Sequence, residues 1–217
     1  MTPLAKSLIA GTALLILMPS LTCAQTSTNT SNVLNGQIDL QSDIAKLNTQ
    51  VTNIAGNVAS SADAGGNNVQ IYTMNDTNVL NTQIVGNSAD IVATQNANVQ
   101  NAGGTVDLQA QAICNGTDIS TDPHNVNVNS YQECDATDPY AQLNANVDTA
   151  GNDTSLLATA IGNTFSEDTN APNTNIITRQ LNTSTEEAVV NSAVKNVYGN
   201  LSIGATAVGN TATIVHY

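Results

Sequence analysis

The sequence predicts an all-β protein built as a β-solenoid (β-helix) of irregular short repeats. Small and β-branched residues alternate along much of the chain, most plainly over residues 201–217, and such alternation is typical of strands. Half of the fourteen glycines are followed by Asn, and these two residue types readily form the turns that separate short strands. Similar phrases recur along the chain, as expected when each coil must stack on the next to bury its apolar face.

The N-terminal end of the chain has the pattern of an export signal. A lysine, a short apolar run and a small-residue cleavage site follow one another, so we expect residues 1–24 to be a secretory signal peptide. Lipidation of Cys23 is the open alternative to cleavage after residue 24. The polar residues 25–31 predict a flexible N-terminus, and residues 32–217 form the predicted solenoid domain.

The composition limits both the core and the partners. Aromatic residues make up 3% of the 217 residues and Trp is absent, so the core must consist of Val, Ile, Leu and Ala. Only four Lys or Arg oppose seventeen Asp or Glu, which gives a net charge of −13. Such a chain repels nucleic acid, so DNA and RNA binding are excluded. The abundant Asn can form side-chain ladders between equivalent positions of stacked coils.

Internal repeats define the expected coil. Residues 32–38 and 78–84 agree at six of seven positions and lie 46 residues apart. Copies of a Gly-Asn phrase predict turns at Gly56-Asn57, Gly86-Asn87, Gly162-Asn163 and Gly209-Asn210. A solenoid coil of roughly 20 residues then predicts about nine coils in the chain after the signal, and a rod roughly 40–45 Å long at ~4.8 Å per strand.

Two segments depart from the simple strand pattern. Apolar residues over 40–58 recur at spacings of three and four, so a short N-terminal helix is an alternative to a strand there. Residues 114–140 contain two Asp-Pro pairs and both cysteines that follow the signal. We expect this segment to be a loop excursion that a Cys114–Cys134 disulfide pins at its base. The oxidising environment that an exported chain enters would favour this bond.

No sequence motif indicates catalysis. Patterns for an activated serine, a phosphate-binding loop or a zinc protease are absent, and the acid-rich stretches fall in predicted loops. We therefore expect no catalytic residue, no cofactor and no metal site. The alternative is a polysaccharide-cleaving β-helix enzyme, which would need a groove that holds the sole arginine, Arg179, together with several acids.

On its signal peptide, residues 32–38 and the repeated Ala/Val-Gly-Asn-Thr phrases, the chain resembles the holdfast anchor (attachment) proteins of stalked bacteria. The resemblance implies a non-enzymatic β-helical protein that is exported to the cell surface or outer membrane, or into the extracellular space. There it would anchor extracellular polysaccharide or partner subunits. The implied partners are other surface anchor subunits, the polysaccharide and further copies of the chain.

Two weaker similarities keep other structural roles open. Residues 83–95 are similar to the repeats of curlin-type fibre subunits, which leaves a self-assembling fibre as an alternative function. Residues 202–211 resemble the head repeat of trimeric autotransporter adhesins. Both similarities imply repetitive, exported β proteins without an active site.

Overall fold

The computed structural model describes residues 30–122 and 125–217, and all regular structure in these ranges is β-strand. The predicted signal peptide and most of the predicted flexible N-terminus lie outside the described residues. The twelve strands are β1 (Ser31–Asp39), β2 (Asp43–Ile54), β3 (Val58–Thr73), β4 (Thr77–Val85), β5 (Asp90–Ala102), β6 (Val106–Thr121), β7 (Asn125–Cys134), β8 (Thr137–Ala150), β9 (Thr154–Thr169), β10 (Asn173–Asn182), β11 (Glu187–Val197) and β12 (Leu201–His216).

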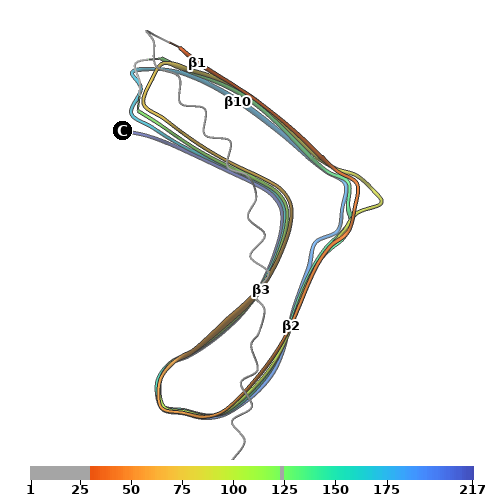
Figure 1. Ribbon diagram of the computed structural model, residues 1–217, viewed down its shortest axis with the longest axis vertical. Coiled ribbons are helices and arrows are strands. Elements are labelled where there is room, and N and C mark those ends of the chain that lie inside the picture. Colours follow the sequence, from red (N-terminus) through yellow and green to blue (C-terminus); the bar gives the residue numbers. More distant parts are fainter. Residues whose placement is uncertain (1–29, 123–124) are drawn as a thin grey trace, which may run out of the picture.

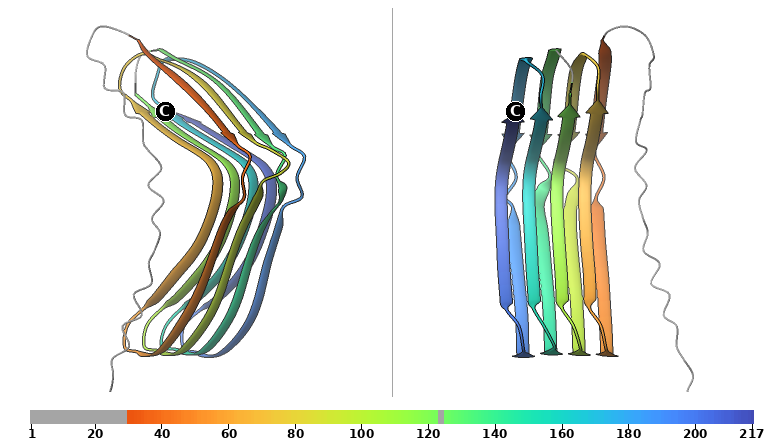
Figure 2. Two further views of the ribbon diagram at one scale, coloured as in Figure 1. Left: turned by 45° about the vertical axis from the view of Figure 1, so that its right-hand side comes forward. Right: turned by 90° about the vertical axis from the view of Figure 1, so that its left-hand side faces the viewer.

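Three parallel sheets form the walls of a solenoid (Figure 1). Every third strand joins the same sheet: β1-β4-β7-β10 form sheet A, β2-β5-β8-β11 form sheet B, and β3-β6-β9-β12 form sheet C. Three consecutive strands therefore make one coil, and four coils stack in register (Figure 2). The all-β solenoid predicted from the sequence is confirmed.

The size of one coil differs from the prediction. Partner residues in neighbouring coils are 46 to 49 positions apart, for example Ser31 with Thr77 and Thr77 with Val126, instead of about 20. Residues 30–217, apart from the undescribed 123–124, thus make four coils, not nine. With neighbouring strands ~4.8 Å apart, the outermost strands are separated by only about 14 Å. The molecule is a short stack of wide coils, and the predicted long rod is wrong.

The correct period was visible in the sequence. The matching segments 32–38 and 78–84 lie side by side on β1 and β4, with every residue paired to its counterpart. The prediction failed because it used a repeat length of roughly 20 residues, which is typical of other solenoids, in place of this separation of 46 residues.

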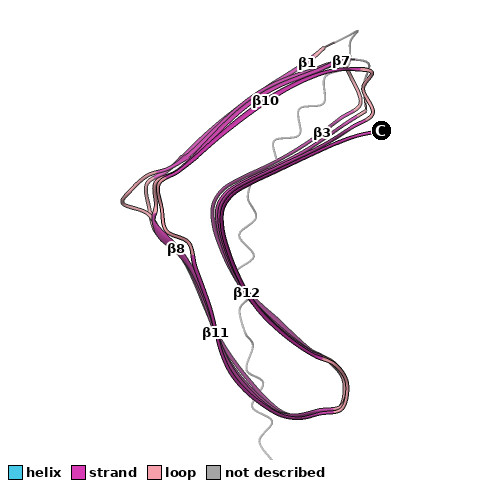
Figure 3. Cartoon of the chain, turned by 180° about the vertical axis from the view of Figure 1, so that it is seen from behind, coloured by secondary structure: helices cyan, strands magenta, loops and turns pink. Residues whose placement is uncertain are grey.

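Each coil has an angular cross-section because the strands of sheet C bend sharply near their middle (Figures 1 and 3). The first half of sheet C packs against sheet B, and the second half packs against sheet A. Two core clusters fill these spaces. The larger one is rich in Ala and Val, and the smaller one contains Phe165, Ile119 and Val128. Small side chains such as Ala110, Ala141 and Ala158, each at most 1% exposed, allow sheets B and C to approach closely.

Two other sequence predictions are wrong. The alternative helix over residues 40–58 is strand β2, whose burial alternates with a period of two along most of its length. The apolar residues at helical spacing there include Ile44, which is exposed, and Leu47, which faces inward as Gln95 and Leu143 do at the same position of the next coils. Residues 114–140 are not a loop excursion, because strands β6, β7 and β8 cover nearly all of them.

A column of left-handed residues ends sheet B. Asn53, Asn101, Thr149 and Asn196 have φ angles of 55°, 54°, 70° and 52°, whereas no described glycine has a positive φ. The Asn101 Nδ2 donates to the Asn53 Oδ1 at 2.8 Å, which links two of these corners. Three of these four left-handed residues are asparagine, whereas the sequence predicted that Gly and Asn together would adopt this conformation.

Candidate functional site

The outer face of sheet B carries an asparagine ladder through all four coils. Asn48, Asn96, Asn144 and Asn191 occupy one register position. The Nδ2 of each later residue donates to the Oδ1 of the preceding one, at 2.9, 2.8 and 3.0 Å. A neighbouring column adds an Asn146–Asn98 bond of 3.1 Å. This confirms the expected type of ladder, although the sequence analysis did not locate it.

A shallow groove of about 1060 Å³ follows this ladder across the four coils. Its polar lining includes Asn96, Asn98, Asn144 and Asn146, while the side chains of Ala97 and Ala145 between them point into the core. None of the thirteen lining residues is Asp, Glu, Lys or Arg. In a chain with seventeen acidic residues, this groove is therefore an uncharged surface.

Two further outer grooves carry carboxylates. The hollow on the outside of sheet C, about 380 Å³, includes Asp63 and Asp118 in its lining. The groove beside sheet A, about 620 Å³, contains Asp76 and two short asparagine pairs, Asn125–Asn173 and Asn127–Asn175, bonded at 3.1 and 2.8 Å. The three grooves thus differ in charge.

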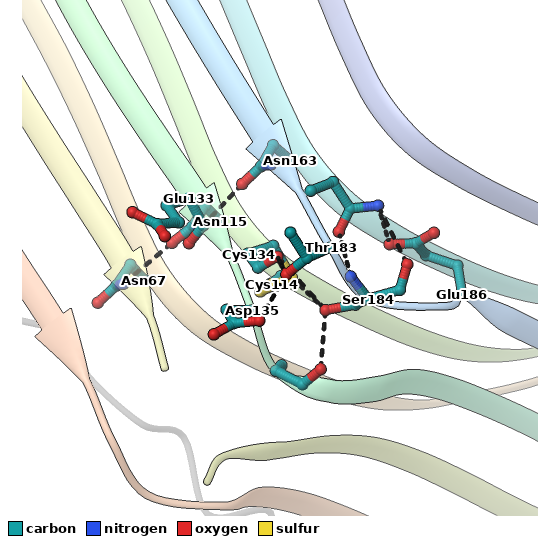
Figure 4. Close-up of a disulfide and its surroundings, with 12 residues drawn as sticks. Asn67, Cys114, Asn115, Glu133, Cys134, Asp135, Asn163, Thr183, Ser184 and Glu186 are labelled. Carbon is teal, nitrogen blue, oxygen red and sulfur yellow. Dashed lines mark hydrogen bonds between the residues drawn. A yellow bond between two sulfur atoms is a disulfide. The ribbon is translucent and has the colours of Figure 1, made fainter. Parts of the chain in front are cut away.

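The predicted Cys114–Cys134 disulfide is confirmed (Figure 4). Cys114 lies near the middle of β6 and Cys134 at the end of β7, with Cα atoms 5.9 Å apart and both side chains fully buried. The bond crosses from sheet C of the second coil to sheet A of the third. It therefore ties the interior of the stack together and does not pin an external loop.

Two predicted turn pairs instead build a buried ladder beside the disulfide. Asn163 and Asn210 follow Gly162 and Gly209 inside β9 and β12, so their assignment to turns between strands is wrong. Together with Asn67 and Asn115 they form one column, bonded at 2.9, 2.7 and 2.8 Å. Figure 4 shows its three buried members, Asn67, Asn115 and Asn163, and the fourth, Asn210, is exposed.

Each of the first three side chains in this buried column also caps a strand of sheet A. The Nδ2 atoms of Asn67, Asn115 and Asn163 donate to the backbone oxygens of Ile84, Glu133 and Leu181, respectively. The second N–H of each amide thus satisfies a carbonyl at the corner where sheet A meets sheet B. A Cβ at Gly162 would press against the carbonyl oxygen of Gly209, which explains glycine beside the ladder.

The other two predicted turn pairs lie between strands. Gly56 and Asn57 connect β2 to β3, and Gly86 and Asn87 connect β4 to β5. The Asn57 Oδ1 accepts from the Thr105 backbone N–H in the next coil at 2.9 Å. These corners therefore contribute side-chain hydrogen bonds between coils as well as a change of direction.

Both ends of the stack expose residues of the core-forming strands. The first coil exposes large apolar side chains, including Leu34, Ile38 and Ile44. The last coil exposes Ile203 and Ile214, which stand at the register positions of the buried Leu156 and Glu167. Within the described residues, no element covers β1, β2 and β3 at one end or β10, β11 and β12 at the other.

One carboxyl group lies inside the smaller core. Glu167 is fully buried, its Oε1 accepts from the Thr121 hydroxyl at 3.3 Å, and its Oε2 has no hydrogen-bond partner. Burial raises the pKa of Glu167 to about 7, and the nearby Asp168 adds to that rise, while the Thr121 bond opposes it. No charged partner compensates this group, so its role in the fold depends on protonation.

The enzyme alternative requires Arg179 and several acids in one groove. Arg179 lies on the outer face of sheet A, beside Tyr131 in register. Residues 30–122 and 125–217 contain no group of three or more His, Cys, Asp or Glu that could hold a metal ion. The same ranges contain no helix that could cross a membrane.

These observations define a parallel β-solenoid with amide-lined outer faces, a buried disulfide and two open ends. The model of the family HfaD, holdfast attachment protein D, matches residues 20–216. The chain therefore belongs to the holdfast attachment protein D family, which implies a role in holdfast attachment. No curated protein and no solved structure matches the chain.

Proposed function

We propose that the chain is an exported, non-enzymatic anchor at the cell surface that attaches extracellular polysaccharide and partner subunits. The observation that carries this proposal is the division of the outer surface into an uncharged amide groove on sheet B and carboxylate-bearing grooves elsewhere. Side-chain amides both donate and accept hydrogen bonds, as a polymer rich in hydroxyl groups requires. Membership of a holdfast attachment family supports the same role.

The stacked construction suits a mechanical role. Every strand except those at the two ends is paired on both sides, and ladders inside and outside the solenoid add side-chain bonds between coils. Tension across the stack would therefore be shared by many parallel hydrogen bonds. The buried Cys114–Cys134 disulfide supports export, because such bonds persist in oxidising compartments.

The test is deletion of the gene, followed by measurement of surface attachment and of polysaccharide retained on the cells. We expect cells that still secrete the polysaccharide but shed it into the medium. Unchanged attachment after deletion would refute the anchoring function. Release of sugars from extracellular polysaccharide by the purified protein would instead favour the β-helix enzyme.

The open ends favour a second candidate, a self-assembling fibre subunit. Because the molecule is only about 14 Å thick along its stacking direction, a long filament requires many copies placed end to end. The unpaired edges of β1 and β10, for example, offer backbone groups for such growth. Cross-β diffraction from purified protein would support this candidate, and a chain that stays monomeric at high concentration would count against it.

A further inference from the structure

We propose that the groove over the asparagine ladder of sheet B is the polysaccharide-binding site, and that it takes an uncharged, extended glycan chain aligned with the stacking direction. This inference rests on the proposed anchoring function and adds to it the site and the ligand class. The site comprises the outer columns of Asn48, Asn96, Asn144 and Asn191 and of Gln50, Asn98, Asn146 and Ala193.

The side-chain amides of the ladder have donor and acceptor groups that the ladder itself does not use. An amide has two N–H donors and an oxygen with two lone pairs. At Asn96, one N–H donates to Asn48 and the oxygen accepts once from Asn144. One donor and one acceptor site therefore remain at each inner rung, and they repeat at ~4.8 Å along the stack. A chain of hydroxyl-bearing rings can use such a regular series of donors and acceptors.

One outer position of the groove supplies an apolar contact. Ala193 stands at the register position of Asn146 and lines the groove, so its methyl group lies on the outer face, whereas Ala97 and Ala145 pack in the core. Sugar rings present C–H faces together with hydroxyl edges. Amide columns with a methyl group at their end can contact both parts of such a ring.

The lack of charged side chains in this groove favours a neutral ligand. Charged side chains begin only in the adjacent columns, with Lys46 on one side and Asp148 paired in register with Lys195 on the other. An anionic polymer would be repelled by the net charge of −13. A cationic polymer would instead favour the carboxylates Asp63 and Asp118 on sheet C. The uncharged groove therefore fits an uncharged chain.

The experiment measures co-sedimentation of the full exported chain with four polysaccharide probes. Cellulose and chitin are neutral, alginate is anionic and chitosan is cationic. We expect binding to at least one neutral probe that persists at 0.5 M salt, because screening weakens only charge-driven contacts (Debye length roughly 4 Å). Binding to chitosan alone that disappears at this salt concentration would overturn the neutral groove.

Paired substitutions locate the site. Asn96→Val with Asn144→Val removes the central amides and keeps a β-favouring side chain, and we expect at least tenfold weaker binding. The matched control, Asn127→Val with Asn175→Val, removes a ladder bond of 2.8 Å from sheet A and should bind within about twofold of wild type. Ala193→Glu places a charge in the groove while leaving every ladder bond intact, so it tests the site even if the first pair folds poorly.

The outcomes separate the site from the function. If the folded groove variants bind as wild type does, or if the sheet A control loses as much binding, the sheet B site is wrong. If wild type binds no neutral probe but gene deletion still releases polysaccharide from cells, the site is wrong and the anchoring function stands. If deletion leaves attachment unchanged, the anchoring function itself fails.

Discussion

Glu167 shows how one buried residue makes the stability of the solenoid depend on pH. Its carboxyl lies among apolar side chains without a charged partner, and burial raises its pKa from 4.5 to about 7. The folded protein therefore holds this proton more tightly than the unfolded chain does. Stability from this group is complete below about pH 4.5 and is lost as the pH rises to about 7.

We predict that Glu167→Gln removes most of this pH dependence. Above pH 7 the variant should be more stable than wild type by about 3 kcal/mol, since one pKa unit corresponds to ~1.4 kcal/mol. Denaturant unfolding between pH 4 and 8 measures the difference. The exposed neighbour provides the control: Asp168→Asn removes only the smallest of the three influences on the Glu167 pKa, so it should keep most of the wild-type slope. Asp43, whose pKa burial and Asp39 raise to about 6, leaves a smaller residual slope. A variant as pH-sensitive as wild type would contradict this account.

Thr149 is the poorly suited member of the left-handed column at the end of sheet B. Its φ of 70° is costly for a β-branched side chain, whereas the other three positions are asparagine. We predict that Thr149→Asn stabilises the protein by about 1 kcal/mol. The reverse change, Asn101→Thr, should destabilise it and break the 2.8 Å bond to Asn53. Thermal unfolding of both variants tests the prediction, and a lower melting temperature for Thr149→Asn would refute it.

At the scale of elements, the disulfide connects strands that backbone hydrogen bonds do not join. Cys114 belongs to sheet C and Cys134 to sheet A, with a sequence separation of 20. Replacing both by Ala should lower the free energy of unfolding by roughly 3 kcal/mol on the chain-entropy estimate. Reductant should destabilise wild type by a similar amount and leave the double variant unaffected. Two free thiols in the oxidised protein, measured by mass, would refute the bond.

The buried asparagine ladder should matter more to stability than the exposed one. Asn163→Leu would leave the Leu181 carbonyl and the neighbouring Asn115 and Asn210 amides short of partners. Because buried unsatisfied groups cost about 1–3 kcal/mol each, we predict a loss of at least ~2 kcal/mol. Asn191→Leu, at the exposed end of the outer ladder, should cost under ~1 kcal/mol. Equal losses in denaturant unfolding would contradict the distinction.

At the scale of the whole molecule, the open ends determine whether copies associate. We predict that Ile203→Lys with Ile214→Lys, on exposed positions of β12, prevents concentration-dependent assembly by placing charges on the end of the stack. Thr213→Lys, at the position between Ala212 and Ile214 whose side chain faces the outer side, is the control and should assemble as wild type does. Light scattering over a range of concentrations measures the effect. Assembly that is insensitive to both changes would place the contact elsewhere.

Local sequence patterns were enough to predict the strand content, the repetitive stacking and the cysteine pair. Alternation of small and β-branched residues is local, so it predicts strands wherever it occurs, and two cysteines after a predicted export signal have few other partners. The 46-residue match between segments 32–38 and 78–84 already contained the length of a coil. The type of outer ladder was also foreseeable from the abundance of asparagine, but its position was not.

Packing between coils determines which Gly-Asn pairs lie at corners between strands and which lie inside a strand. Gly56-Asn57 and Gly162-Asn163 are locally alike, yet the first connects two sheets and the second lies within β9. The difference arises from packing, because Asn163 is buried in a ladder that three other coils complete. The same holds for residues 114–140, whose Asp-Pro pairs suggested a loop although neighbouring coils pair most of the segment as strands. Stacking contacts between residues nearly fifty positions apart outweigh local turn preferences, and no local pattern records them.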